Sequence, residues 1–365
     1  MQYDRYPVLE IDLKKLETNA ENIRRHCDAH GIKLCAVVKG FMALPEMVDT
    51  VIRAGCDQIG TSRLSQIRSM RERGVKGPFM LLRIPQLCEI AECAEIADYS
   101  LHSEVRALDA LNDACRKIGR KHKAVIMFDL GDLREGFWDE EEGISAAVHV
   151  EKDLDWLELA GVGVNLGCYG TIRPTVEKMN ALIDIARRVE AKIGRRLEIV
   201  SGGATTSYGL VDRDIMPAGI NHLRIGEEIS CGADVPYLDG SYVPDDISNT
   251  VLTFKAQICE LKRKPTRPVG EFFRDAFRLT PDFPDRGNRM RAIAAFGRAD
   301  IADFSYLERG PEGITILGGS SDHALLDVED YKGELKVGDV LSWHPTYAGQ
   351  LFLCFAPDVK IVYKK

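Results

Sequence analysis

Three groups of residues that could do chemistry lie at or near the ends of apolar runs. Lys39 follows LCAVV, the stretch SGGATT (201–206) follows LEIV, and Arg224 lies inside LRIG. A lysine in a partly apolar pocket has a lowered pKa, so that its free amine can form a Schiff base. By position alone, Lys39 also fits an ordinary strand-end lysine whose long side chain reaches solvent.

The other two groups suit an anion and a fixed cation. The small residues of SGGATT, together with Gly226, would expose backbone N–H groups to a phosphate, although a glycine-rich turn with a hydroxyl cap explains them as well. Arg224 is either a structural ion-pair partner or a permanently charged donor facing a ligand. A lysine, a phosphate-binding loop and a permanent cation together fit a phosphorylated aldehyde cofactor bound as an imine.

The elements that must position these residues alternate regularly. Between residues 13 and 235, eight short apolar runs occur, and seven of them are separated by segments of helical length. Apolar runs that alternate with helices indicate a parallel sheet covered on both faces. Eight units favour a closed (β/α)8 barrel (TIM barrel) over the alternative, an open doubly wound sheet. In such a barrel, functional groups gather at the carboxyl ends of the strands.

After about residue 240 the pattern changes. Helical periodicity fades, and short alternating or apolar runs appear between Gly, Pro and Asp; they include TVLTFKAQICEL, RAIAAFG, GITILGG and LFLCFAP. This pattern predicts a second, β-rich domain over 236–365. Residues 262–291, rich in charge and proline, are expected to form a long loop between strands.

Composition excludes several classes of function. The chain has 365 residues with a formal net charge of −8, so it has no bulk attraction to nucleic acid or to an anionic membrane. No apolar run reaches the length of a membrane span, and no secretory signal is recognisable. The ten cysteines are scattered without a CxxC pair, which favours reduced thiols in a cytoplasmic protein and predicts no metal site.

With these features in place, the chain resembles the fold-type III pyridoxal-phosphate (PLP) enzymes of the alanine racemase superfamily. It is most similar to the alanine/ornithine racemase branch, and to ornithine racemases in particular. The similar motifs run in order through nearly the whole chain: YPVLEIDLKKLETNA, AVVKG, MLLRIPQLCE, FDLGDLREGF, GVGVNLGCYG, IVSGGAT, LRIGEEI, GSSDHALLDVED and LKVGDVLSW.

The resemblance implies a PLP-binding TIM barrel over 13–235, and a β-rich domain formed by 236–365 together with the N-terminal strand in 1–12. It implies a homodimer with active sites shared between a barrel and the partner's β-rich domain. Lys39 would carry the cofactor as an internal aldimine and shuttle the substrate's α-proton on one face. The residues implied to bind the cofactor besides Lys39 are Ser201, Gly202, Gly203, Thr205 and Gly226 at the phosphate, Tyr347 near it, and Arg224 at the pyridine nitrogen.

The role of Arg224 has a chemical consequence. An arginine does not give up its proton in a protein, so it would leave the ring nitrogen unprotonated. The ring is then a weaker electron sink, and the carbanion recaptures a proton quickly. This suits racemisation better than elimination or transamination.

The chain also departs from alanine racemases. Their second base is a tyrosine, but Arg298 in FGRADI stands at that place, and arginine is a poor base. The candidates for the second base are Asp322 and His323 in SSDH, Cys168, or a water held by Arg298, and the pKa of histidine suits physiological pH best. The SSDH stretch also fits an ordinary turn.

Further departures concern the substrate. Met127 replaces a modified lysine near Arg134, and Gly40, Phe41 and Met42 replace the usual residues after Lys39, which argues against alanine. Arg134 would keep its contact on the carboxylate side, with Asp129 and Cys168 nearby. Acidic residues could meet a distal ammonium, as in ornithine or a similar basic amino acid, or could be ordinary solvated acids near helix starts: Asp129, Asp132, Glu135, Glu227 and Glu228.

Two alternatives keep the same fold. One is a different PLP reaction, decarboxylation or aldol cleavage, although the HxGS and CESxD motifs of the decarboxylases are absent. The other is a non-catalytic PLP-binding protein, although such relatives are usually bare barrels without a β-rich domain.

Overall fold

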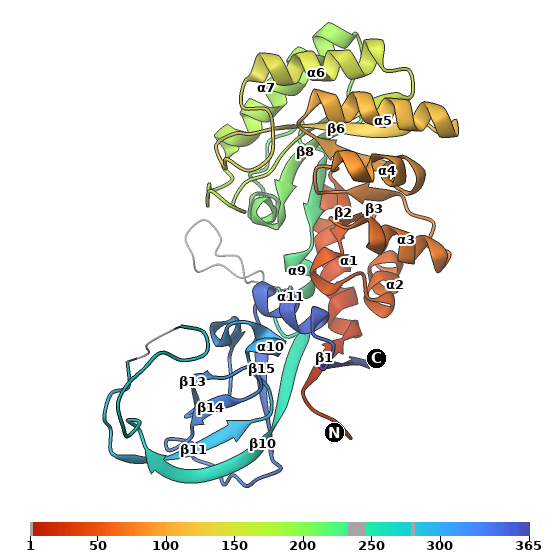
Figure 1. Ribbon diagram of the computed structural model, residues 1–365. Coiled ribbons are helices and arrows are strands. Elements are labelled where there is room, and N and C mark those ends of the chain that lie inside the picture. Colours follow the sequence, from red (N-terminus) through yellow and green to blue (C-terminus); the bar gives the residue numbers. More distant parts are fainter. Residues whose placement is uncertain (1–2, 233–245, 279–281) are drawn as a thin grey trace. The chain divides into compact units, whose positions relative to one another are not determined.

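The computed structural model describes residues 3–232, 246–278 and 282–365. These residues form two compact units, which are drawn in Figure 1. The barrel unit comprises Lys14–Asn249, and the β-rich unit comprises Met1–Leu13 with Thr250–Lys365. The boundary expected at 235/236 lies outside the described residues.

The barrel unit is built on a closed barrel of parallel strands, which confirms the predicted TIM barrel. Each strand pairs with its neighbour in sequence, and the last pairs with the first, with Ala36 opposite Ile225. The strands are β2 (Lys33–Val37), β3 (Gln58–Thr61), β4 (Phe79–Leu81), β5 (Tyr99–His102), β6 (His122–Phe128), β7 (Leu157–Val164), β8 (Ile199–Ala204) and β9 (His222–Ile225).

The barrel closes because its strands are apolar on both faces. One set of side chains fills the interior: Cys35, Met80, Tyr99, Leu101, Val125, Met127, Ala160 and Ile199. The alternate residues face the helices. The small residues of β7 allow close approach, since a Cβ on Gly161 would lie 1.8 Å from the carbonyl oxygen of Ile199.

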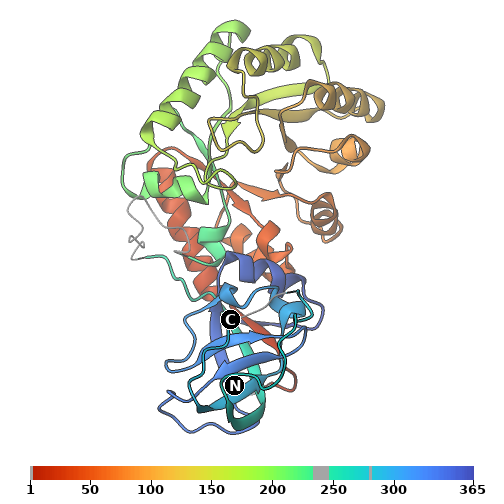
Figure 2. The ribbon, with the colours of Figure 1, turned by 60° about the vertical axis from the view of Figure 1, so that its left-hand side comes forward.

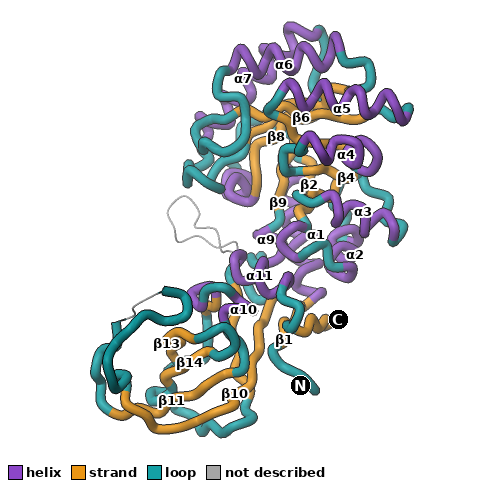
Figure 3. The backbone as a smooth tube through the Cα atoms, viewed as in Figure 1, coloured by secondary structure: helices purple, strands orange, loops and turns teal. Residues whose placement is uncertain are grey.

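Helices surround the strands, as Figures 2 and 3 show. They are α1 (Leu13–Ala29), α2 (Pro45–Arg53), α3 (Leu64–Glu72), α4 (Ile90–Ile96), α5 (Val105–Ile118), α6 (Glu140–Asp153), α7 (Val176–Ile193), α8 (Tyr208–Asp212) and α9 (Glu227–Ser230), with the 3₁₀ turns η1 (Lys39–Phe41), η2 (Leu87–Glu89) and η3 (Thr205–Ser207). Local sequence sets their ends. Thr175 caps α7 by accepting from the N–H of Lys178, and Gly194 ends it in the left-handed conformation.

The β-rich unit contains antiparallel strands joined in the order β12-β15-β10-β11-β14-β13. Its strands are β1 (Val8–Asp12), β10 (Leu252–Pro265), β11 (Asn288–Ala294), β12 (Leu307–Glu308), β13 (Thr315–Gly319), β14 (Ala324–Asp327), β15 (Val340–Pro345) and β16 (Lys360–Lys364), with the short helical segments α10 (Arg298–Ile301) and η4 (Phe304–Tyr306). The N-terminal strand β1 pairs with β10 and β16, which confirms that this strand joins the C-terminal domain.

One apolar run of this unit does not form the expected strand. The first five residues of LFLCFAP belong to helix α11 (Tyr347–Phe355). Thr346 caps the helix by accepting from the N–H of Gly349 at 3.3 Å, and the buried residues Gly349, Gln350, Leu353 and Cys354 share one helical face. The periodicity of a short continuous apolar run does not distinguish a buried strand from a helix. The cap at Thr346 is the feature that indicates a helix here.

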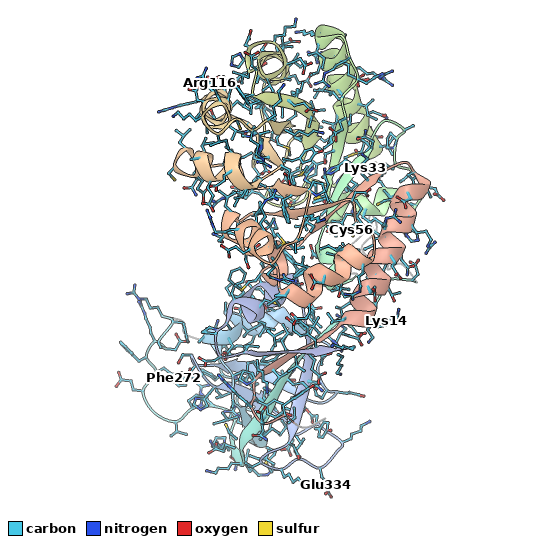
Figure 4. The ribbon with its side chains drawn as sticks, turned by 90° about the vertical axis from the view of Figure 1, so that its right-hand side faces the viewer. Lys14, Lys33, Cys56, Arg116, Phe272 and Glu334 are labelled. Atoms are coloured by element: carbon cyan, nitrogen blue, oxygen red, sulfur yellow. The ribbon has the colours of Figure 1, made fainter. Side chains whose placement is uncertain are left out.

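The expected long loop is shorter than 262–291, because β10 continues to Pro265 and β11 begins at Asn288. Between them, Phe272 packs against Phe283 with ring centroids 6.2 Å apart, and Figure 4 labels its side chain. The neighbouring Phe273 is 89% exposed. Among the residues described in either unit, no helix is both long and apolar enough to span a membrane.

Candidate functional site

Lys39 begins the 3₁₀ turn η1, separated by one residue from the end of β2, at the carboxyl end of the barrel. Burial lowers the pKa of its ammonium group; Arg134 and Arg224 lower it further, while Cys168 and Glu135 oppose the shift. The structure therefore brings Lys39, Arg134, Cys168 and Arg224 into one electrostatic neighbourhood. A lysine with a lowered pKa exposes a free amine to a carbonyl more often than a solvated lysine does.

The carboxyl ends of β2 and β9 approach closely at Gly226. A Cβ at Gly226 would lie 2.6 Å from the carbonyl oxygen of Val37, so the position accepts only glycine without movement. The N–H of Gly226 donates to Oγ1 of Thr205 at 3.3 Å, which joins the loop after β8 to the end of β9. The two loops expected to form the phosphate site are thus adjacent.

The loop after β8 turns sharply because of its glycines. Gly203 has φ +119°, and a Cβ there would lie 2.5 Å from Oγ of Ser207. Oγ of Ser207 donates to the carbonyl oxygen of Gly202 at 2.8 Å, which fixes the turn that leads into η3 and α8. A side chain at Gly202 would also clash, since a Cβ there would lie 2.7 Å from Cγ2 of Ile220, so this turn requires both glycines.

Arg224 is buried and points to fixed acceptors. Its Nη2 donates to the carbonyl oxygen of Val164 at 2.8 Å, and its Nη1 donates to Oγ of Ser201. Oγ of Ser201 in turn lies 2.8 Å from Nδ1 of His222, and Nε2 of His222 lies 3.0 Å from Oε1 of Gln58. Burial lowers the pKa of His222 to about 3, so the ring is neutral and this chain of bonds orients the guanidinium.

Ser201 is therefore bonded differently from the expectation. Its hydroxyl accepts from Arg224 and donates to His222, so it faces the guanidinium and not the space beside Gly203 and Gly226. His222 and Gln58 were missed in the sequence. His222 lies two residues before Arg224, and this period-2 spacing places both side chains on one face of β9.

The loop after β6 holds the candidate substrate residues. Oδ1 of Asp129 accepts from the N–H groups of Gly131 and Leu133 at 2.8 and 3.1 Å, which makes this carboxylate part of a turn. The buried carboxylate of Asp132 accepts four backbone N–H bonds from the loop after β7, at Gly167, Cys168, Tyr169 and Ile172. Asp132 is thus an anchor that positions Cys168, another role that the sequence did not reveal.

Met127 is fully buried in the barrel interior, where the relatives were expected to carry a modified lysine. After Lys39, Gly40 and Phe41 are buried, whereas Met42 is 38% exposed with φ +54°. The side chain of Cys168 is exposed. Glu227 and Glu228 lie in the short helix α9, and Glu228 is buried.

Arg298 and the SSDH stretch of the β-rich unit lie side by side. The N–H of Arg298 donates to the carbonyl oxygen of Ser320 at 3.0 Å, which sets the start of α10 beside the SSDH stretch. The guanidinium of Arg298 lies over the rings of Phe277 and Phe304, at 5.0 and 5.3 Å from their centroids, and its Nη1 donates to the carbonyl oxygen of Ala302. Asp322 and His323 are exposed in this turn. Tyr347 begins α11, which packs against α10.

Comparison with known proteins defines the class to which this fold and site belong. Residues 11–229 match the model of the alanine racemase N-terminal domain. A lysine racemase from Thermotoga maritima is 38% identical over 98% of this chain and 99% of its own length. An ornithine racemase from Acetoanaerobium sticklandii is 38% identical over 95% of this chain and 96% of its own length.

Solved structures agree on the fold. An alanine racemase from Streptomyces lavendulae superposes with a TM-score of 0.75 at 20% identity, covering 100% of this chain and 98% of its own. A D-threonine aldolase from Filomicrobium marinum has a TM-score of 0.72 at 16% identity, covering 94% and 88%. The chain belongs to the alanine racemase family, whose enzymes depend on PLP. This membership confirms the prediction of an amino-acid racemase, an isomerase.

Proposed function

We propose that this racemase acts on a basic amino acid, ornithine or lysine, with PLP held at Lys39. The observation that carries the proposal is the pairing of Lys39, whose pKa is lowered by burial, with the buried and fully oriented Arg224 at the same end of the barrel. The lysine and ornithine racemases that match nearly the whole chain support this substrate class.

The residues present fit PLP. Glycine at 203 and 226 allows the close backbone packing that brings the two loops together at the hydroxyl of Thr205, and backbone N–H groups of these loops would hold the phosphate. Gly202 belongs to this loop, and Tyr347 of the β-rich unit is proposed to reach the phosphate. Ser201 acts through Arg224, whose guanidinium would face the pyridine nitrogen. Lys39 would hold the aldehyde carbon.

Bound PLP supplies an electron sink that makes the substrate's α-proton acidic. Nζ of Lys39 takes or returns this proton on one face, and a lowered pKa increases the neutral fraction of this amine at physiological pH. Arg224 donates without releasing its proton, so the α-carbon is reprotonated quickly. Arg134 holds the substrate's carboxylate side, while the loop at Asp129 and Cys168 lines the entrance.

Racemisation needs a second proton carrier on the opposite face. We propose His323, assisted by Asp322, because both are exposed in the turn beside Arg298. Arg298 itself stands at the place of the tyrosine in alanine racemases. Cys168 and a water held by Arg298 are the alternatives. In a homodimer with shared sites, the partner's β-rich unit would bring this turn to the barrel. A cytoplasmic location fits the free cysteines of the described chain.

The first experiment measures absorbance of PLP-loaded protein before and after borohydride, for the wild type and Lys39→Ala. The wild type should show the imine band and lose it on reduction, with the label on Lys39, and the variant should lack it. A panel of amino acids, followed by optical rotation and α-deuterium exchange, then tests the substrate. Colourless reconstituted wild type, or label on another residue, contradicts the cofactor proposal; absence of exchange with basic amino acids contradicts the substrate proposal.

A further inference from the structure

Glu135 carries a carboxylate that has no role in the proposed reaction. Its Oε1 accepts from Nη2 of Arg134 at 2.6 Å, and its Oε2 accepts from Nε of the same guanidinium. The side chain of Glu135 is 15% exposed and that of Arg134 is 38% exposed. Both oxygens of a largely buried acid are thus paired with the cation that is proposed to hold the substrate's carboxylate.

The loop that carries this pair is fixed at both ends. The N–H of Asp129 donates to the carbonyl oxygen of Phe137 at 3.0 Å, and the N–H of Phe137 donates to that of Met127 at 2.8 Å. A Cβ at Gly136, which has φ +135°, would lie 2.4 Å from the backbone nitrogen of Asp129. Nζ of Lys178 also donates to the carbonyl oxygen of Leu130 at 2.5 Å. The backbone therefore presents Glu135 in a set position, and only its side chain is free to rotate.

Glu135 acts electrostatically on three cations, Lys39, Arg224 and Arg134. It opposes the lowering of the pKa of Lys39 by burial, and it opposes the lowering of the pKa of Arg224 by burial. It also raises the pKa of Arg134 against the effect of burial. One acid therefore acts on three basic groups. The substrate would bring its α-carboxylate to the same place and, if it is a basic amino acid, also its side-chain ammonium.

We propose that Glu135 binds the side-chain ammonium of the substrate while Arg134 binds its α-carboxylate, so that the internal ion pair is exchanged for two substrate ion pairs. This inference rests on the proposed racemase function and names the residue that selects basic amino acids. A neutral side chain offers Glu135 no partner, so Glu135 keeps competing with the substrate's carboxylate for Arg134. The pair therefore rejects neutral amino acids as well as attracting basic ones.

The test compares Glu135→Gln, Glu135→Asp and the wild type as PLP-loaded full chains. Steady-state kcat/KM is measured for ornithine, lysine and norvaline, and the change of cofactor absorbance with amino-acid concentration gives a dissociation constant. In Glu135→Gln, kcat/KM for ornithine and lysine should fall about 10–100-fold, mainly through KM, while that for norvaline stays or rises. Glu135→Asp should keep part of the preference.

A matched control is Glu89→Gln. Nη2 of Arg83 donates to both oxygens of Glu89 at 2.6 Å, so this variant also breaks an arginine–glutamate pair of intermediate exposure, but one outside the loop after β6. It should leave the ornithine-to-norvaline ratio unchanged.

Equal losses for ornithine and norvaline in Glu135→Gln would overturn the inference, because Glu135 would then only position Arg134. An unchanged preference for ornithine would overturn it as well. These outcomes appear only in the variants, whereas failure of the proposed function appears in the wild type as a missing imine band or missing exchange. A wild type that prefers norvaline to ornithine would leave the racemase standing and remove the role of Glu135.

Discussion

Arg224 owes its orientation to a short chain of buried hydrogen bonds. Its guanidinium is held by the carbonyl oxygen of Val164 and the hydroxyl of Ser201, and Ser201 is itself held by the neutral ring of His222. An unpaired guanidinium on a long side chain would sample several rotamers. The buried hydroxyl of Ser201 therefore holds the guanidinium of Arg224 in one orientation.

The variant Ser201→Ala tests this role. It leaves Nη1 of Arg224 and Nδ1 of His222 without their shared partner in a buried site, so we expect a loss of about 1–3 kcal/mol in the free energy of unfolding. We also expect kcat to fall and the wavelength of cofactor absorbance to shift, because the guanidinium of Arg224 would no longer be held in one position at the pyridine ring.

Thr50→Val is a suitable control for Ser201→Ala. Oγ1 of the buried Thr50 donates to the carbonyl oxygen of Glu46 within α2, so its loss should lower stability without a spectral change. If Ser201→Ala leaves both the spectrum and kcat as in the wild type, the hydroxyl does not orient Arg224.

Two loops at the carboxyl end of the barrel are joined by one carboxylate. Asp132 after β6 accepts four N–H groups of the loop after β7. These bonds outweigh burial and hold the pKa of Asp132 below its usual value, so the anion persists at physiological pH. The loop that carries Cys168 has its conformation set by this anion.

Asp132→Asn should therefore loosen the loop after β7. An amide has one accepting oxygen in place of two, so at least some of the four bonds fail, at a cost of about 2–3 kcal/mol. Hydrogen exchange of the amides from Gly167 to Ile172 should accelerate, and KM should rise more than kcat falls. Unchanged exchange in this stretch, with intact helices as the internal reference, would contradict the anchoring role.

Three buried histidines of the barrel strands predict a marked dependence of stability on pH. His102, His122 and His222 have pKa values lowered to about 3 by burial. A histidine in the unfolded chain has a pKa of about 6.5, so below that pH the unfolded state binds more protons. The free energy of unfolding should thus fall as the pH falls, by up to about 4 kcal/mol per pH unit.

Urea unfolding at pH 7.5, 6.5 and 5.5 checks this expectation. His102→Gln should reduce the slope by about a third. His149 is an internal control, because its contribution to stability should depend on pH with the opposite sign. Hydrogen bonds to Asp109 and Asp153 raise its pKa at the surface, so its contribution to stability is lost as the pH rises. A midpoint that is constant across this range would contradict the burial of neutral histidines.

The elements themselves were largely predictable, for a physical reason. Strands buried on both faces are apolar runs, and their alternation with amphipathic helices reveals the barrel without any knowledge of contacts. The rule that barrel chemistry lies at strand ends then singled out Lys39 and Arg224. The bonding partners of Ser201, Asp129 and Asp132 could not be foreseen, because one hydroxyl or carboxylate suits a ligand, a turn or a neighbouring loop equally well. Helix α11 was missed because its cap, Thr346, lies outside its apolar run.

The proposed homodimer with shared sites predicts how mixtures of two inactive variants behave. Lys39→Ala lacks the barrel half of the site, and His323→Ala is expected to lack the second-face base. After joint unfolding and refolding in equal amounts, half of the dimers are mixed, and each mixed dimer has one intact site. Activity should return to about a quarter of the wild-type value.

Two observations would contradict this arrangement. A mixture no more active than its separate components would mean that each chain completes its own site, and light scattering that gives the mass of one chain would exclude the dimer. Full activity of His323→Ala alone would instead remove the proposed base, and the same mixing would then be done with Tyr347→Ala.

The position of β1 imposes an order on biosynthesis. This strand is translated before the other strands that the structure describes, yet its antiparallel neighbour starts at Leu252 and its parallel neighbour at Lys360. During translation, the barrel unit can fold while β1 still lacks its hydrogen-bonding partners. Closure of the smaller unit is thus delayed until β16 has been translated, and a ribosome stalled before β16 emerges should carry a protease-sensitive β1 attached to an already resistant barrel.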